Sequence, residues 1–475
     1  MMTPISQRRF FLGKRQNSLL LLIMCDAFAS VHFPNGRQVT AVRMPLVPQA
    51  SKPLPKTKHI TLEYPPYWTI NMPPFDSHYS MFAKTAASHA IQWLYHQHIL
   101  EKDNAEKANW ERRIKQMNVA SYGGSSCLLG NFQHSLLHTK FVLLWLIWDD
   151  VVVERVETSP ELKDLINQHL RQVTSIMYGT FTPSHACSSS AISGGVSPHR
   201  PKTTGNPVLR PFPNIGDAGT IFWQHTLMPF ANAWQSIMQD ILRLFDFSTT
   251  FHVRLGKTFD DWVLAAKQER DNAGAHIRLT FQELVEQRKR TIGLKTTLIT
   301  LELWMGMEIP PHIAHSVDFI HFCDIATELV GLVNDLVSLG KDIIHFEQEE
   351  ETKSHASDNG VNTNNQKDAE TKEHMWPNIV LAYMTENRIC LTYAIAYIVQ
   401  HHDLLVAQMD ALSLQILSNC GEEWWECLSG YFCHVRYCVR GFNLWHTVTP
   451  RYTQHAPLDL ITNTLFVFSS PTANG

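Results

Sequence analysis

The segment Phe141–Glu154 reads FVLLWLIWDDVVVE, and it carries the clearest structural signal in the chain. Its apolar run from Phe141 to Trp148 is long enough to cover every face of a helix. A helix that is apolar on all sides is buried among other elements. The segment therefore predicts a fully buried helix that ends at Asp149 and Asp150.

Two adjacent carboxylates, Asp149 and Asp150, stand at the mouth of this predicted helix, and Glu154 follows one turn past Asp150. Neighbouring carboxylates at such a position repel each other and lose hydration. A cation between them would offset both costs. Clustered oxygen ligands suit Mg²⁺, which keeps several waters and accepts phosphate oxygens. Because Asp-Asp pairs are common, a helix that simply reaches solvent at Asp149 is an equal interpretation of this segment alone.

Apolar and charged residues mix with helical spacing through most of the chain. We find no convincing run of alternating strands and no internal repeat of fixed period. Long helices with short connections predict an all-α bundle. The segments with this texture are 80–109, 135–178, 219–246, 256–304, 312–346, 376–419 and 421–446.

We expect one α-helical domain over residues 59–460, between an irregular, Pro-rich N-terminal tail at 1–58 and a C-terminal tail at 461–475. Two segments inside this domain, 182–216 and 347–374, cannot bury enough apolar surface to offset the entropy of ordering them. Both are expected to be flexible surface insertions, and both could be unspliced intron sequence.

A second oxygen-rich site is predicted in the segment CDIATELVGLVNDLVSLGKD at Cys323–Asp342. Asn334, Ser338 and Asp342 recur at every fourth position, so they share one face of a helix. Amide, hydroxyl and carboxylate oxygens on one face form a plausible site for a hard cation. Lys341 beside them adds positive charge for an anionic ligand. The alternative is a polar helix face that happens to be regular.

Together these segments resemble the class I terpene synthases, in the single-domain form found in fungi and bacteria. The resemblance runs in order from about residue 60 to residue 455 and implies an all-α bundle around a deep central cavity. It is carried by Asp149-Asp150 with Glu154, by QRKRTIG at Gln287–Gly293, by Asn334-Asp335-x-x-Ser338-x-x-Lys341-Asp342, and by Asn443-Leu444-Trp445 followed by Pro450-Arg451-Tyr452.

The resemblance implies metal-dependent ionisation of an isoprenyl diphosphate, followed by cyclisation of the carbocation to a sesquiterpene. Farnesyl diphosphate is favoured by analogy with single-domain relatives. The implied cofactor is Mg²⁺, as three ions. The expected metal ligands are Asp149, Asp150, Asn334, Ser338 and Asp342. The residues expected to hold the diphosphate are Arg288, Lys341, Arg451 and Tyr452.

Two positions depart from the family's pattern. The first motif usually has its last acid at the position of Val153, whereas here Glu154 comes one residue later, so Glu154 is not among the expected metal ligands. The second motif ends on Asp342 in place of the commoner Glu, so a shorter side chain must lean further toward the metal.

Aromatic side chains should line the apolar part of such a pocket, because ring faces stabilise cations. Plain core packing is the commoner role of any single aromatic residue. The candidates are Phe141, Trp145, Trp148 and Trp445.

Charge and cysteine content restrict the partners and the compartment. The formal net charge of -4 gives no reason to expect a nucleic acid partner. Nine cysteines without a Cys-x-x-Cys pair indicate reduced thiols of a cytoplasmic protein. Basic residues before the apolar run Leu19 to Cys25 loosely resemble a targeting signal, but the run is too short to span a membrane. We expect no integral membrane association, and the oligomeric state is open.

Two other functions fit parts of the pattern. A prenyl chain-elongating transferase usually has two aspartate-rich motifs, and the Asn-Ser-Asp face at 334–342 argues against it. A helical protein of the same fold could also have lost its activity through the insertions at 182–216 and 347–374. Release of diphosphate from farnesyl diphosphate would separate these functions.

Overall fold

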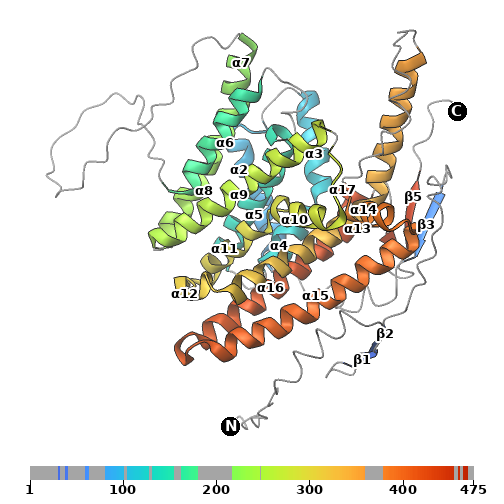
Figure 1. Ribbon diagram of the computed structural model, residues 1–475. Helices are drawn as coiled ribbons and strands as arrows, with labels where there is room; N and C mark the ends of the chain where they lie inside the picture. Colours follow the sequence, from blue (N-terminus) through green and yellow to red (C-terminus); the bar gives the residue numbers. More distant parts are fainter. Residues whose placement is uncertain are drawn as a thin grey trace.

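The computed structural model describes most of the chain between residues 81 and 453, together with short strands near both ends. The described ranges are 30–32, 38–40, 59–63, 81–100, 104–127, 131–153, 162–179, 217–245, 248–275, 277–358, 378–453, 458–459 and 464–468. Within them the chain folds into a bundle of helices (Figure 1), so the prediction of an all-α fold is confirmed.

The helices of the bundle follow one another along the chain, and the described strands all lie before α2 or after α17. They are α2 (Ala83–His96), α3 (Asn104–Met117), α4 (Val119–Ser126), α5 (Phe132–Trp148), α6 (Lys163–Met177), α7 (Asp217–Phe222), α8 (Met228–Leu244), α9 (Thr249–Gly274), α10 (Phe281–Thr291), α11 (Leu294–Met305), α12 (Pro311–Ala314), α13 (Val317–Asp358), α14 (Ile379–Asn387), α15 (Leu391–Asn419), α16 (Glu422–Val448) and α17 (Pro450–Thr453). Two π-helical turns, η3 (Asp149–Val153) and η6 (Trp223–Leu227), interrupt this series.

Helix α5 is buried on all sides, as its apolar run predicts. The Asn131 side chain caps its first turn by accepting a hydrogen bond from the His134 backbone amide at 3.0 Å. Phe141, Leu144 and Trp148 are almost completely shielded from solvent, and α2, α4 and α8 pack around the helix. The α-helix ends at Trp148, and the π-turn η3 carries Asp149 and Asp150 directly after it.

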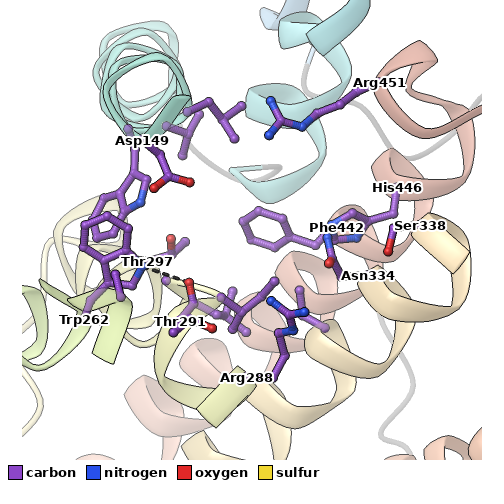
Figure 2. Close-up of a pocket in the computed structure, with 18 of the residues that line it drawn as sticks. Asp149, Trp262, Arg288, Thr291, Thr297, Asn334, Ser338, Phe442, His446 and Arg451 are labelled. Carbon is purple, nitrogen blue, oxygen red and sulfur yellow. Dashed lines mark hydrogen bonds between the residues drawn. The ribbon is translucent and has the colours of Figure 1, made fainter. Parts of the chain in front are cut away.

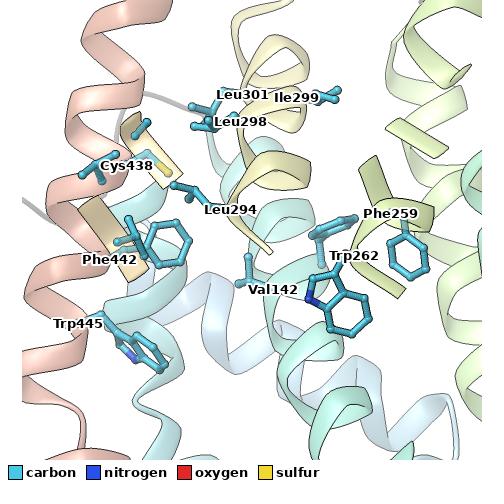
Figure 3. Packing of buried hydrophobic residues seen from close by; sticks show 14 of the residues in the cluster. Val142, Phe259, Trp262, Leu294, Leu298, Ile299, Leu301, Cys438, Phe442 and Trp445 are labelled. Atoms are coloured by element: carbon cyan, nitrogen blue, oxygen red, sulfur yellow. The ribbon is translucent and has the colours of Figure 1, made fainter. Parts of the chain in front are cut away.

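The core continues through aromatic packing between α5 and α9. The Trp145 and Trp262 rings lie 4.7 Å apart, centroid to centroid, and the Trp148 and Phe259 rings lie 5.6 Å apart. Figure 3 shows α9 with Trp262 on one side of this core and α16 with Phe442 on the other, with α5 and α11 between them. Aromatic pairs of this kind contribute about 0.5–1.5 kcal/mol each beyond their area burial.

Helix α13 is the longest element and supplies the second predicted oxygen cluster. Its middle packs between α15 and α16, and its C-terminal part projects from the bundle (Figure 1). The predicted loop at 347–374 is wrong in its first part, because the helix continues to Asp358. The Glu-rich and Lys-containing sequence there has good intrinsic helix propensity. Residues 359–374 and the other predicted insertion, 182–216, lie outside the described residues.

Short strands lie near both ends of the chain. Strands β1 (Ser30–His32) and β2 (Gln38–Thr40) pair antiparallel. Strand β5 (Thr464–Phe468) pairs antiparallel with β3 (His59–Glu63) and with β4 (Leu458–Asp459). Strands β1, β2 and β5 fall in the predicted tails, whereas β3 and β4 fall just inside the predicted helical domain 59–460. The segments that precede and follow the helical region therefore pair with each other through β3 and β5, and β5 contacts α13 (Figure 1).

The described helices differ from membrane-spanning segments in length or in apolar character. No single one of them has the length and apolar character to cross a membrane. By length and composition alone, α14 and α15 meet that criterion as a joined pair, with a bend of 118° between them.

Candidate active site

The helices surround a cavity of about 620 Å³. Small-molecule sites typically enclose about 300–1,000 Å³. Both predicted oxygen clusters contribute to its wall: Asp149 lies on one side, and Asn334 and Ser338 lie across from it on α13 (Figure 2). The predicted residues that line it are Asp149, Arg288, Asn334, Ser338, Lys341, Asp342, Arg451 and Tyr452. Two clusters that are far apart in sequence thus face one cavity.

Asn334 is fixed by hydrogen bonds from its amide nitrogen. The Nδ2 group donates to His446 Nε2 and to Tyr452 Oη, each at 3.1 Å. Because the nitrogen is committed to these two acceptors, the amide oxygen points away from them. An oxygen held in this way by its neighbours suits a hard cation.

Ser338 and Asp342 lie one turn apart on the same face of α13. Ser338 Oγ donates a hydrogen bond to Asp342 Oδ2 at 2.7 Å. Asn378 Nδ2 donates to the same carboxylate oxygen at 2.8 Å. The shorter Asp side chain at this position is therefore supported from a neighbouring segment of the chain.

Asp150 has different surroundings from Asp149. Its side chain is only 5% exposed and accepts two hydrogen bonds from Arg451, both at 2.9 Å. Arg113 donates a third at 2.7 Å. Asp150 is not among the residues that line the cavity. The structure thus places Asp149 at the cavity wall and engages Asp150 in a buried ion pair. Glu154 lies outside the described residues.

Arg288 lines the cavity and is held by two carboxylates. Its Nε lies 3.0 Å from Asp335 Oδ1, and Nη1 lies 3.3 Å from Glu269 Oε1. Burial lowers the pKa of Arg288, but the nearby Asp335 and Glu269 raise it more, so the net shift is upward. Burial raises the pKa of Asp335 to about 6, against the opposing effect of Arg288. The guanidinium therefore stays charged beside the cavity.

Lys341, Arg451 and Tyr452 lie at the same end of the cavity. The Lys341 ammonium is 3.9 Å from Asp342 Oδ1 and 5.7 Å from the centre of the Tyr452 ring. Arg451 reaches the cavity from α17 while it pairs with Asp150 (Figure 2). The positive charge predicted for an anionic ligand is thus gathered near the oxygen clusters.

Several lining residues were not predicted. Glu269 and Arg270 come from α9, where a charged turn looks like ordinary helix surface in the sequence. His446 directly follows the quoted Asn443-Leu444-Trp445 element, and this adjacency was the available signal. Burial, with a further contribution from Arg451, lowers the pKa of His446 to about 3, so the imidazole is neutral near pH 7.

The apolar part of the cavity is aromatic. Phe141, Trp145 and Trp445 line it, as does Trp262, which was not predicted. Trp148 was a candidate wall residue, but it does not line the cavity. It is fully buried, and its Nε1 donates to His169 Nε2 at 2.9 Å. When an apolar run covers every face of a helix, the sequence does not show which of its residues line the cavity and which pack in the core.

The donor set fits a hard divalent cation. Asp149, Asn334, Ser338 and Asp342 contribute carboxylate, amide and hydroxyl oxygens to one cavity, and Mg²⁺ prefers oxygen ligands. Among the described residues, no three His, Cys, Asp or Glu side chains form a metal cluster on their own. The fit therefore depends on Asn334 and Ser338, and bound phosphate oxygens would complete the coordination.

Residues 223–408 match the family model described as terpene synthase family 2, C-terminal metal binding. This range includes Arg288, Asn334, Ser338, Lys341 and Asp342, and it implies a divalent metal. A search of curated proteins finds no match to the chain.

Solved structures of terpene synthases share the fold. The chain superposes on a-eudesmol synthase with a TM-score of 0.54 at 14% identity, covering 78% of this chain and 97% of that one. A cucumene synthase variant gives a TM-score of 0.52 at 14% identity, with 80% and 99% covered. The SVS_A2 protein from ancestral sequence reconstruction gives 0.54 at 15% identity, with 78% and 88% covered. At such identities the likeness shows the fold alone.

Proposed function

We propose that this chain, which has the fold of class I terpene synthases and contains a terpene synthase metal-binding region, converts farnesyl diphosphate to a sesquiterpene with Mg²⁺. Such an enzyme is a carbon–oxygen lyase that acts on an isoprenyl diphosphate. The observation that carries the proposal is one cavity lined by two oxygen clusters, by cationic side chains and by aromatic rings.

The oxygen clusters are the proposed site of the metal. Asp149, Asn334, Ser338 and Asp342 would hold the ions, and we propose three of them, as the resemblance implies. Bound Mg²⁺ supplies Lewis-acid neutralisation of the departing diphosphate. Asp150 serves this site indirectly, because it holds Arg451 at the cavity.

The cationic residues are the proposed diphosphate clamp. Arg288 and Arg451 offer planar guanidinium groups that can each hold two oxygens. Lys341 adds an ammonium group, and Tyr452 Oη can donate its proton to a diphosphate oxygen while it accepts from Asn334. Donors placed where negative charge develops lower the barrier to leaving-group departure.

The aromatic walls would hold the carbocation that ionisation leaves behind. Trp145, Trp262 and Trp445 present ring systems to the cavity, and desolvated cation–π contacts are worth about 2 kcal/mol or more. Burial of these rings also keeps water from the cation, since water would trap it as an alcohol before cyclisation.

The test is incubation of the full-length protein with geranyl, farnesyl or geranylgeranyl diphosphate and Mg²⁺. We expect diphosphate release and a cyclic fifteen-carbon product from farnesyl diphosphate, and we expect EDTA to abolish both. Products are identified by mass spectrometry. Longer prenyl diphosphates formed with added isopentenyl diphosphate would indicate a chain-elongating transferase. No release from any substrate would indicate an inactive protein of this fold.

A further inference from the structure

The break between α10 and α11 forms part of the cavity wall. Helix α10 ends at Thr291 and α11 begins at Leu294, with Ile292 and Gly293 between them. All four of these residues line the cavity. Whatever fixes the geometry of this break therefore fixes part of the surface that a substrate would meet.

The last carbonyls of a helix lack partners within it. At this break the Ile292 amide bonds to the Arg288 carbonyl at 2.9 Å and closes the final turn of α10. The Thr291 carbonyl accepts a hydrogen bond at 2.8 Å from the indole nitrogen of Trp262 on α9 (Figure 2). A side chain from another helix thus holds the end of α10 in place.

Trp262 is itself held rigidly. Its ring meets that of Trp145 edge to face, with 4.7 Å between centroids and 68° between planes, and lies 5.6 Å from that of Trp148. The residue is 3% exposed, although it lines the cavity. A buried side chain packed in this way has no freedom to follow the break if the break moves.

Gly293 is fixed from the other side of the break. Its φ is +74°, in the left-handed region that favours glycine. A Cβ added there would lie 3.3 Å from Cζ2 of Trp145. Tryptophans from α5 and α9 therefore confine the same short connection. Arg288, in the last turn of α10, leads directly into it.

We propose that Trp262 is a positioning residue that sets the wall of the cavity at the α10–α11 break and so determines the product spectrum. The proposal rests on the terpene synthase function proposed above. Loss of the indole donor would free the Thr291 carbonyl and let the break shift. A shifted wall changes how the carbocation folds and lets water reach it.

The test variant is Trp262→Phe, which keeps an aromatic ring and removes the indole donor. The matched control is Trp148→Phe, which removes the same groups from the same aromatic core. The indole of Trp148 donates its hydrogen bond to His169 and not to the α10–α11 break. We expect Trp262→Phe to raise the ratio of acyclic and alcohol products to the main cyclic product at least severalfold. Trp148→Phe should keep the wild-type ratio, even if it lowers thermal stability.

Hydrogen exchange supplies a readout that needs no turnover. Peptides covering residues 288–294 should exchange about five- to tenfold faster in Trp262→Phe, because one tertiary hydrogen bond no longer restrains the break. The same peptides should keep the wild-type rate in Trp148→Phe. Gly293→Ala perturbs the break from the Trp145 side and should shift the products in the same direction.

If residues 288–294 exchange at the wild-type rate in Trp262→Phe, the indole of Trp262 does not hold the α10–α11 break. This conclusion would stand whether or not the protein turns over any substrate. A wild-type product ratio in both Trp262→Phe and Gly293→Ala would overturn the role in specificity. If Trp148→Phe altered the products as much as Trp262→Phe, general loosening of the core would be the cause. If the wild-type protein shows no turnover but the exchange difference remains, the proposed terpene synthase function is rejected, whereas the restraint of the break by Trp262 is not.

Discussion

Asp149 and Asp150 are neighbours in the chain with separate physical roles. Asp149 lines the cavity, whereas Asp150 is buried between Arg451 and Arg113. The sequence predicts both as metal ligands. It does not reveal the ion pairs of Asp150, because their partners lie 37 and 301 positions away. A contact at that separation leaves no local pattern, so only the fold can show it.

The two carboxylates should therefore respond differently to substitution. Asp149→Ala is expected to reduce turnover by at least about a hundredfold, through loss of metal-borne charge stabilisation worth several kcal/mol. It should change the free energy of unfolding by no more than about 1 kcal/mol, because relief of carboxylate repulsion offsets lost contacts. Asp150→Ala should lower the free energy of unfolding by about 2–3 kcal/mol, since it leaves two partly buried arginines without their counter-charge. Urea unfolding and steady-state kinetics of both variants measure this contrast, and equal stability losses would contradict it.

Arg288 is expected to act through its planar fork and not merely through its charge. Arg288→Lys keeps the charge but loses charge-assisted hydrogen bonds worth roughly 1.5–3 kcal/mol. That loss corresponds to about a ten- to hundredfold fall in turnover. Arg290→Lys, at an exposed position on the same helix, is the matched control. Arg451→Lys should lose turnover as Arg288→Lys does. Steady-state kinetics with farnesyl diphosphate measure these losses. If turnover and products are unchanged in both Arg288→Lys and Arg451→Lys, the diphosphate is held by other residues.

At the scale of helices, periodicity predicted the bundle well and its interruptions poorly. The apolar run at Phe141–Trp148 required a buried helix, and α5 is that helix. The texture over 256–304 did not reveal that the chain breaks before α10 and again at Gly293. Breaks of this kind depend on side chains from other helices, such as Trp262, so a local pattern cannot specify them.

Helices α9 and α11 are tied by a buried ion pair between Arg254 and Glu302. Arg254 Nη1 lies 3.1 Å from Glu302 Oε2, and that oxygen also accepts from the Ile309 amide at 2.9 Å. Neither side chain lines the cavity. The pair therefore supports the walls of the site without contacting its contents.

Arg254→Met is expected to lower the free energy of unfolding by about 3 kcal/mol, because it leaves the fully buried Glu302 carboxylate unpaired. Turnover per folded molecule should stay within about twofold of wild type. The double variant Arg254→Met/Glu302→Gln removes the stranded charge and keeps an acceptor for Ile309, so it should recover most of the loss. Denaturant unfolding of the single and double variants measures this. A double variant as unstable as Arg254→Met would mean that charge burial is not the cause.

At the scale of the whole molecule, buried neutral histidines should make the fold sensitive to acid. Burial lowers the pKa of both His138 and His169 to about 3. Between that value and the ordinary histidine pKa, the unfolded chain binds protons that the folded chain cannot. Stability therefore falls as the pH drops from about 6.5 toward 3, by about 1.4 kcal/mol per pH unit for each such histidine.

His169→Gln tests this dependence. Glutamine keeps an acceptor for the Trp148 indole and does not titrate, so the slope of unfolding free energy against pH should become shallower by about 1.4 kcal/mol per pH unit. His321→Gln, the same substitution at an exposed position on α13, is the matched control. Urea unfolding between pH 7 and pH 4.5 gives the slopes. An unaltered slope in His169→Gln would contradict burial of a neutral imidazole there.

The π-turn Asp149–Val153 carries a consequence for how such proteins are found and how they tolerate length changes. A π-turn closes its hydrogen bond on the fifth residue, so it needs one residue more than an α-turn to return to the same face. A single-residue insertion at this point is thereby taken up within one turn, and the helix that leads into it need not rotate. Across this π-turn, a count in turns and a count in residues therefore differ by one position. Search patterns that demand a fixed residue count after Asp150 would pass over enzymes built in this way.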